Sequence, residues 1–356
     1  MATMLSLIGV AILDVIGLTV LEPAMHFMNV PEEIFADAAS YVAIITYGLV
    51  AMMGYNLLAG ILRALGDSKT PLYFLIVATV VNVILALFFI IYCGWGVPGS
   101  AWGIVLAQTI SVILCVLYIH HRLPVLHLTR EDWVWDKHFA LEHLRIGIPM
   151  ACQFSILGIG ILLIQSVCNR FGPQTIAGFT AATRVEQLAL QPMISFSLAM
   201  AVFSAQNYGA HKFDRIRDGV KQCSRVSFIF GLCAAIGIYF FSPQIIGIFI
   251  ESSETAVIND AESYLHLSVP FYFFLSQLFV YRGAVQGMGV AIVPLISSII
   301  ELTMRTGAAM YLATMWGYRG VCYASPIAWV ASSIFLFGAY HYFIRILEKP
   351  FLSQPK

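Results

Sequence analysis

Charged residues are scarce in this sequence. They make up 11% of its 356 residues, whereas apolar residues make up 60%. Soluble globular domains contain about 25% charged and about 45–50% apolar residues, so this composition excludes an ordinary soluble fold. A helix that crosses a bilayer needs about 20 predominantly apolar residues. The composition therefore indicates an all-α, polytopic membrane protein.

Motifs of common catalytic sites are also missing. The sequence contains no GxxxxGK(S/T) loop, no HExxH and no GxSxG, and its apolar stretches carry no acidic pair suited to metal-phosphate chemistry. Its seven cysteines include no CxxC pair, which favours small packing residues over a disulfide framework or a metal site. We therefore expect no enzyme, no catalytic residue, no cofactor and no metal, with an intramembrane enzyme as the rival hypothesis.

Ten stretches are long and apolar enough to cross a bilayer. The predicted spans are residues 4–21, 39–62, 71–92, 98–119, 146–168, 185–206, 226–249, 264–281, 290–313 and 320–344. The first begins next to Met1 without a charged lead-in, so we expect no cleavable signal peptide. Pro192, Pro270 and Pro326 fall inside spans, where proline permits kinks.

One block of the sequence, residues 37–71, occurs again at residues 260–294. Tyr41, Gly66 and Pro71 recur as Tyr264, Gly289 and Pro294 at one constant offset, and the turn at 96–99 recurs at 317–320 with almost the same offset. Spans one to four thus match spans seven to ten, while spans five and six have no upstream counterpart. The repeating unit is six helices, an even number, so we predict parallel repeats about an axis along the membrane normal, the first lacking two helices.

This repeat predicts two lobes. We expect an incomplete N-terminal lobe of four spans at residues 1–122, a cytoplasmic linker at 123–145, a C-terminal lobe of six spans at 146–347 and a C-terminal tail at 348–356. Five histidines lie in or beside the linker, at positions 120, 121, 127, 138 and 143. A solvated linker explains them as well as a metal site would.

Lysine and arginine are distributed unevenly between the two sides of the membrane. If the spans alternate, one side collects fifteen of them, the other collects three, and Arg305 lies inside a span. The fifteen are Arg63, Lys69, Arg122, Arg130, Lys137, Arg145, Lys212, Arg215, Arg217, Lys221, Arg225, Arg282, Arg345, Lys349 and Lys356, and the three are Arg170, Arg184 and Arg319. The basic side is predicted to be cytoplasmic. We therefore expect a protein of the inner membrane with a cytoplasmic C-terminus, and the acidic loops 22–38 and 250–262 suit the opposite face.

Two charged residues lie in the middle of the ninth span. A charged side chain at mid-bilayer costs about 2.5–3.5 kcal/mol on insertion scales, so each one needs a reason. Glu301 and Arg305 are four residues apart, on one face of a helix. They would form either a self-neutralising pair that turns this face toward the bundle interior, or a gate or proton-linked switch.

Further polar residues surround Glu186 near the outer end of the sixth span. Gln187 is next to it in sequence, and Gln165 and Gln153 lie on the fifth span. A carboxylate in partly apolar surroundings can exchange a proton or hold a cation. Arg184 instead favours a structural ion pair with Glu186, so both interpretations stay open.

Several short motifs run in order along the chain. They are residues 62–71 (LRALGDSKTP), Asn82, residues 96–101 (GVPGSA), Gln108, residues 184–186 (RVE), residues 206–210 (QNYGA), residues 287–289 (GMG) and Arg305. In this order and at these spacings they resemble the multidrug and toxic compound extrusion (MATE) family of antiporters. The resemblance implies twelve helices in two six-helix lobes around a central cavity, with this chain starting at the third helix. It also implies export of amphipathic, often cationic compounds in exchange for Na⁺ or H⁺.

The chain differs from the family pattern at two places. The family's first helix, which commonly carries an acid used in ion coupling, has no counterpart in the sequence, and Ala86 stands where many members have an aspartate. The resemblance therefore directs attention to Glu186 and Glu301 in the second lobe.

The main hypothesis is a monomeric secondary transporter that exports amphipathic or cationic compounds by antiport and alternating access. Its partners would be a small-molecule substrate and the lipid bilayer, without nucleic acid. The candidate residues for ion coupling or substrate binding are Glu186, Glu301, Arg305, Gln153, Gln165, Gln187 and Asn82. A flippase for a lipid-linked saccharide is the alternative, although that cargo calls for several cations at depth. A non-functional truncated fragment is a further alternative.

Overall fold

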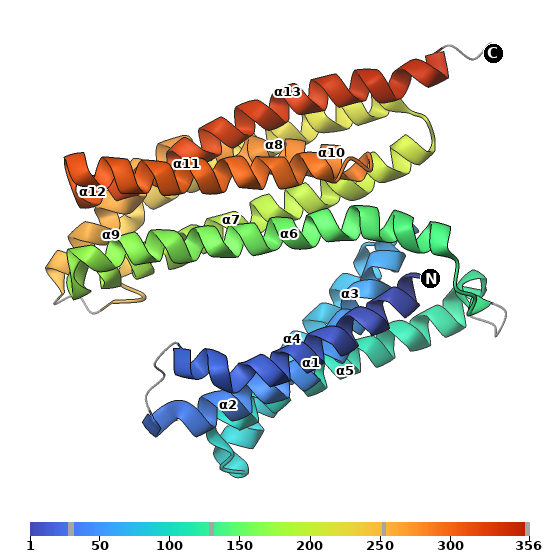
Figure 1. Ribbon diagram of the computed structural model, residues 1–356, viewed down its shortest axis with the longest axis horizontal. Helices are drawn as coiled ribbons and strands as arrows, with labels where there is room; N and C mark the ends of the chain where they lie inside the picture. Colours follow the sequence, from blue (N-terminus) through green and yellow to red (C-terminus); the bar gives the residue numbers. More distant parts are fainter. Residues whose placement is uncertain (28–31, 128–131, 251–253, 353–356) are drawn as a thin grey trace. The chain divides into compact units, whose positions relative to one another are not determined.

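The structure is a computed structural model that describes residues 1–27, 32–127, 132–250 and 254–352. These residues form helices and turns, without a strand among them, which confirms the predicted all-α class. Arg130, Glu251 and Lys356, which contribute to the charge distribution above, lie outside the described residues. The chain divides into two compact units, Met1–His143 and Leu144–Lys356 (Figure 1).

The first unit is built around its last long helix. Its helices are α1 (Ala2–Phe27), α2 (Glu32–Tyr47), α3 (Leu49–Ala64), α4 (Lys69–Leu87) and α5 (Gly96–Arg122). A π-helical turn, Phe88–Tyr92, extends α4, and a short 3₁₀ turn, Pro124–Leu126, follows α5. Helices α2, α3 and α4 all pack on α5, and α1 packs on α2 and α3.

The second unit holds the larger apolar core. Its helices are α6 (Lys137–Cys168), α7 (Pro173–Gly209), α8 (Phe213–Ile246), α9 (Thr255–Ser268), α10 (Tyr272–Gly287), α11 (Ile292–Trp316), α12 (Tyr318–Cys322) and α13 (Ala324–Leu352). Helix α10 packs against α7, α8 and α13, and α11 packs against α13. Helix α6 begins at Lys137, inside the stretch predicted as a linker.

Nine helical segments in the described ranges are long and apolar enough to cross a membrane. The eighth predicted span, residues 264–281, is not among them: it is interrupted by the 3₁₀ turn Val269–Phe271 and becomes parts of α9 and α10. Pro270 explains the interruption, since proline has no amide hydrogen to continue the helical ladder. Many apolar side chains point outward: Leu162 is 70% and Phe240 69% exposed, as expected of surfaces that face lipid.

The repeat predicted from the sequence is visible in the helices themselves. Helices α3 and α10 begin and end at corresponding positions of the repeat, and each follows a break, at Gly48 and at Val269–Phe271 respectively. Two pairs of glycines share a left-handed backbone: φ is +92° at Gly66 and +82° at Gly289, and +57° at Gly96 and +59° at Gly317. Residues with a Cβ rarely adopt this conformation, which explains why both copies keep glycine there.

The repeated helix pairs also share a packing contact. The Ser111 hydroxyl of α5 donates to the Phe74 carbonyl of α4 at 3.2 Å. The Ser332 hydroxyl of α13 donates to the Ser297 carbonyl of α11 at 3.1 Å. These positions correspond at the two sequence offsets, so the α4–α5 and α11–α13 pairs have the same register.

Candidate ion-coupling and substrate site

Glu186 is a buried carboxylate of the second unit. It lies on α7 with 7% of its surface exposed, and its Oε2 accepts a hydrogen bond of 2.9 Å from the Tyr264 hydroxyl of α9. Its Oε1 is buried and has no hydrogen-bond partner within the described part of the chain. One oxygen of a buried carboxylate is therefore satisfied and the other is left to bind something else.

The contact between α7 and α9 holds Tyr264 in place. Phe179 of α7 meets the Tyr264 ring edge-to-face, with centroids 5.3 Å apart. One turn earlier, the Thr175 hydroxyl donates to Asp260 Oδ2 at 2.9 Å. A Cβ on Gly178 would stand 2.8 Å from the Val257 carbonyl oxygen, so a glycine is needed for this close approach. The packing of α9 against α7 thus holds the Tyr264 hydroxyl next to Glu186.

Two further polar groups act on Glu186. Tyr272, at the start of α10, is fully buried, and no described residue satisfies its hydroxyl; it interacts electrostatically with Glu186. Arg305 of α11 is half-buried, and its charge also acts on Glu186. The Arg305 guanidinium lies beside Gly160 of α6, and its buried Nε lacks a partner among the residues described. Glu186 of α7 is thus bonded to Tyr264 of α9 and interacts electrostatically with Tyr272 of α10 and Arg305 of α11; we call these four residues the polar group around Glu186.

Glu301 does not pair with Arg305, contrary to the first of the two interpretations above. Its ion pair is with Arg282 of α10, whose Nη2 lies 3.0 Å from Glu301 Oε1, and both side chains are 5% exposed. Arg282 Nη2 also lies 3.3 Å from the Ser297 hydroxyl, which in turn bonds to Ser332. Arg282 and Glu301 meet because α10 packs against α11. The four-residue spacing of Glu301 and Arg305 within α11 does not by itself pair those two side chains. Arg282 is therefore a buried structural cation, and its assignment to a cytoplasmic loop was wrong.

The remaining predicted residues belong to several different helices. Gln153 of α6 is buried, and its Oε1 has no partner in the part of the chain that the structure describes. Gln165 lies near the end of α6, and its amide nitrogen donates to Asn169 Oδ1, four residues later, at 3.2 Å. Gln187 of α7 is exposed. Asn82 belongs to the first unit, on α4, with a buried Oδ1 that no described group satisfies. At the offset of the repeat it corresponds to Arg305, so the two copies carry an amide and a guanidinium at one equivalent position.

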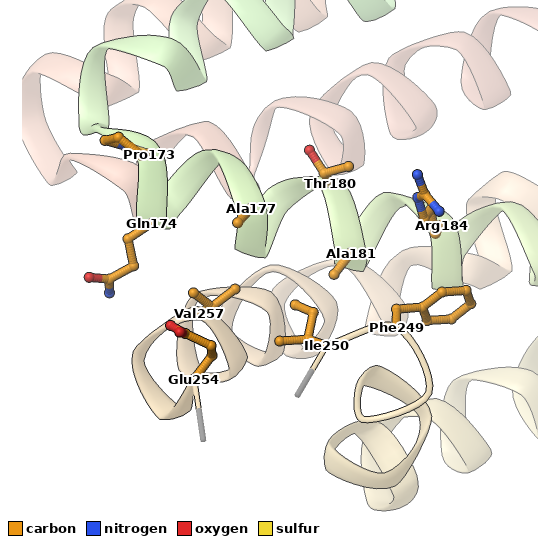
Figure 2. A pocket seen from close by; sticks show the side chains of 10 residues that line it. All are labelled: Pro173, Gln174, Ala177, Thr180, Ala181, Arg184, Phe249, Ile250, Glu254 and Val257. Carbon is orange, nitrogen blue, oxygen red and sulfur yellow. The ribbon is translucent and has the colours of Figure 1, made fainter. Parts of the chain in front are cut away.

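The second unit also contains a cavity of about 670 Å³, between the first half of α7 and the residues around the start of α9. Figure 2 shows side chains of α7 along one wall, and Ile250, Glu254 and Val257 along the other. Arg184 lines the cavity, whereas Glu186 points to the buried side of α7 and does not. Arg184 makes no ion pair with the residues described, so it is not the partner of Glu186 that its sequence position had favoured.

Metal ligands are not assembled in the described chain: no three His, Cys, Asp or Glu side chains there gather closely enough to hold an ion. All seven cysteines lie within it as free thiols. Sequence reasoning missed Tyr272 and Arg282. It also missed Tyr264 as a partner of Glu186, although this tyrosine is a landmark of the repeat.

Comparison with known proteins decides the family. A family model described as MatE matches residues 1–88 and 149–307, more than half of the chain. The chain belongs to the MatE family. Two curated relatives from Bacillus subtilis (strain 168) are probable multidrug resistance proteins. YoeA is 27% identical over 346 residues, covering 94% of this chain and 74% of YoeA. YpnP is 28% identical over 328 residues, covering 92% of this chain and 73% of YpnP.

Solved structures show the same fold. A MATE protein in the bent conformation has a TM-score of 0.90 at 22% identity, covering 98% of this chain and 78% of that one. An outward-facing multidrug resistance MATE transporter of the MOP superfamily has a TM-score of 0.91 at 23% identity, covering 97% and 77%. The chain thus has the fold of a MATE family transporter, and the predicted resemblance is confirmed.

Proposed function

We propose that this protein exports amphipathic, often cationic compounds in exchange for H⁺ or Na⁺. Its family membership makes it a transporter, and the names of its curated relatives refer to multidrug resistance. We further propose that it works as a monomer in the inner membrane. Moving Arg282 from the loops to the core reduces the basic side from fifteen to fourteen against three, so the proposed cytoplasmic C-terminus is unaffected.

The observation that carries the coupling proposal is the half-satisfied carboxylate of Glu186. An ionised carboxylate inside a membrane protein requires compensating charge or hydrogen bonds. Tyr264 supplies one donor, while Oε1 has no described partner. A proton or a sodium ion arriving at Oε1 would complete the group. A cationic substrate nearby would be favoured by the same negative charge and disfavoured once the ion is bound.

This competition provides the exchange. An ion and a substrate that bind the same carboxylate exclude one another, and each shifts the population of conformations that it binds better. Arg305 weakens the attraction for a cation, because its positive charge also acts on Glu186. Tyr264 positions the carboxylate through its hydroxyl. These residues need no cofactor to perform this exchange.

The proposal is tested by replacing Glu186 with glutamine in the protein reconstituted into vesicles. Glutamine keeps the size of the side chain but cannot exchange a proton or carry charge. Export of a cationic dye driven by an imposed proton or sodium gradient should fall to the level of protein-free vesicles. Glu142→Gln is the matched control, since Glu142 is an exposed residue of α6 whose carboxylate lies 3.7 Å from His138. Unchanged gradient-driven export in Glu186→Gln would remove Glu186 from the mechanism.

The structure adds nothing in favour of the alternative, a lipid-linked saccharide flippase. Arg282 is a second cation at depth, but Glu301 neutralises it. Arg305 is the one cation among the predicted site residues, and its charge acts on Glu186. A single guanidinium acting on the Glu186 carboxylate fits a cationic cargo better than a pyrophosphate-like one.

A further inference from the structure

The basic end of the second unit contains a cavity that the transport site does not use. It measures about 370 Å³ and is lined by residues of α8, α10 and α13, and α10 packs against both of the other helices. Four of its lining residues are cationic: Arg217, Lys221 and Arg225 on α8, and Arg345 on α13. No acidic side chain is among the lining residues that the structure describes.

The cations come from regularly spaced positions. Arg217, Lys221 and Arg225 are four residues apart, as are His341 and Arg345, so each set lies on one face of its helix. Helix α8 is 34 residues long, or about 51 Å, whereas the hydrocarbon core is about 30 Å thick. The cationic first turns of α8 therefore reach the depth of the lipid headgroups.

Most of this charge is not neutralised by the protein. Arg217 is committed, because its guanidinium bonds to Glu348 of α13 and to Asp214. Lys221 Nζ lies 3.8 Å from Asp218 Oδ1, and both side chains are more than two-thirds exposed, so this contact is weak. Within the described residues, Arg225 and Arg345 form no ion pair. Two or three positive charges thus converge on the cavity without a counter-ion.

One wall of the cavity is aromatic. The rings of Tyr281 and Phe337 meet edge-to-face at 5.4 Å, and Tyr340 lies 5.5 Å from Tyr281. His341 packs on Phe337 at 4.3 Å and bonds through Nδ1 to the Phe337 carbonyl. Val220 and Ile344 also line this wall. A cationic rim above an apolar, aromatic wall suits an anionic group that carries a hydrocarbon chain.

We infer that this cavity binds the phosphate headgroup of an anionic phospholipid from the surrounding bilayer. Phosphate oxygens would accept from Arg225, Arg345 and Lys221, while the glycerol and upper acyl carbons would lie on the aromatic wall. The bound lipid would link α8 to α13, alongside the Arg217–Glu348 ion pair. This inference is independent of the exported compound. A free phosphate ion would bind to the same cationic side chains, but it has no hydrocarbon part to pack against the aromatic wall.

The test compares lipids on the full chain in neutral detergent. Short-chain phosphatidylglycerol and phosphatidylcholine are titrated separately, and bound lipid is counted by native mass spectrometry and followed by the rise in Tm. We expect phosphatidylglycerol to bind and phosphatidylcholine not to bind. The double variant Arg225→Gln/Arg345→Gln should bind phosphatidylglycerol about thirtyfold more weakly. Each cation removed near a lipid surface lowers the affinity for an anionic headgroup by about fivefold.

The matched control is Lys212→Gln/Arg215→Gln. It removes two charges from the same end of α8, and neither residue lines the cavity. We expect this control to bind phosphatidylglycerol as the unaltered protein does. Equal binding by the Arg225/Arg345 variant, or equal weakening in the control, would overturn the inference. Inorganic phosphate that displaced the lipid at comparable concentration would show that the cavity takes soluble phosphate and would overturn the lipid assignment.

Discussion

Arg282 and Glu301 show how the fold holds two opposite charges inside the membrane region. Each side chain is 5% exposed, and their closest atoms are 3.0 Å apart. Ser297 and Ser332 extend the pair into a polar chain between α10, α11 and α13. Removal of one partner leaves the other as an uncompensated buried charge, which typically costs about 3–5 kcal/mol.

We expect Glu301→Gln to lower thermal stability strongly, because Arg282 would be left charged and buried. The double variant Arg282→Gln/Glu301→Gln should recover most of the loss, since two neutral amides can bond to each other and to Ser297. Tm in detergent measures both variants. A double variant as unstable as the single one would show that the serines and neighbouring packing, rather than charge compensation, stabilise this region.

Asp67 is a hydrogen-bonded carboxylate in the turn between α3 and α4, outside the membrane spans. Its Oδ1 accepts from the Thr70 amide at 3.0 Å, and its Oδ2 accepts from the Tyr118 hydroxyl at 3.1 Å. The bond from Thr70 and, to a smaller extent, that from Tyr118 hold the pKa of Asp67 below its ordinary value. The ionised carboxylate therefore links the first turn of α4 to α5.

A pH dependence follows from this lowered pKa. The stabilisation by Asp67 is fully present above the ordinary carboxyl pKa of about 3.9 and is lost as the pH falls through the lower folded-state value. Asp67→Ala should cost about 1 kcal/mol at pH 7, as for other lost helix-terminal caps, and the difference from the unaltered protein should shrink below pH 4. Asp218→Ala, on an exposed face, is the control. A difference in Tm that stays constant down to pH 3 would contradict this role.

The contact between α7 and α10 depends on two glycines one turn apart. A Cβ on Gly283 would overlap the backbone oxygen of Ser197, and a Cβ on Gly287 would overlap that of Ala201. Small residues four apart allow the backbones of membrane helices to approach closely, where dispersion and weak hydrogen bonds accumulate. This contact fixes α10, and hence Tyr272 and Arg282, relative to the α7 helix that carries Glu186.

Gly283→Ala should destabilise the second unit by about 1–3 kcal/mol, the usual cost of overpacking, and lower Tm accordingly. Gly307→Ala is the matched control in α11, because a Cβ there meets nothing within 4 Å. The control should be neutral or slightly stabilising, as alanine favours helix over glycine. Equal Tm values for both variants would show that α7 and α10 can separate without cost.

At the scale of the whole molecule, the two units have corresponding glycine conformations and helix register but differ in their polar side chains. The glycine conformations and the serine contact correspond in both copies. By contrast, Arg305 corresponds to Asn82, and Val290 stands where the first copy has Asp67. The two copies therefore have the same backbone register but carry different charged residues, which gives each unit its own chemistry.

The proposed orientation in the membrane can be measured directly. In a background with the seven cysteines replaced, we introduce Lys349→Cys near the end of α13 or Glu254→Cys beside α9, both at exposed positions. A membrane-impermeant thiol reagent added to intact cells should label Glu254→Cys, and Lys349→Cys should react only after lysis. The reverse pattern would overturn the orientation drawn from the basic residues.

The sequence alone determined the helical class, the repeat and the family, because these depend on local composition and on spacing along the chain. Glycines at 66, 96, 289 and 317 were found as landmarks before their conformation was known. The tertiary structure alone decided which polar groups meet. Glu301 pairs with Arg282 rather than with Arg305, and Tyr264 rather than Arg184 bonds to Glu186. Such pairings depend on how helices distant in sequence pack against each other, and spacing within one helix carries no information about that.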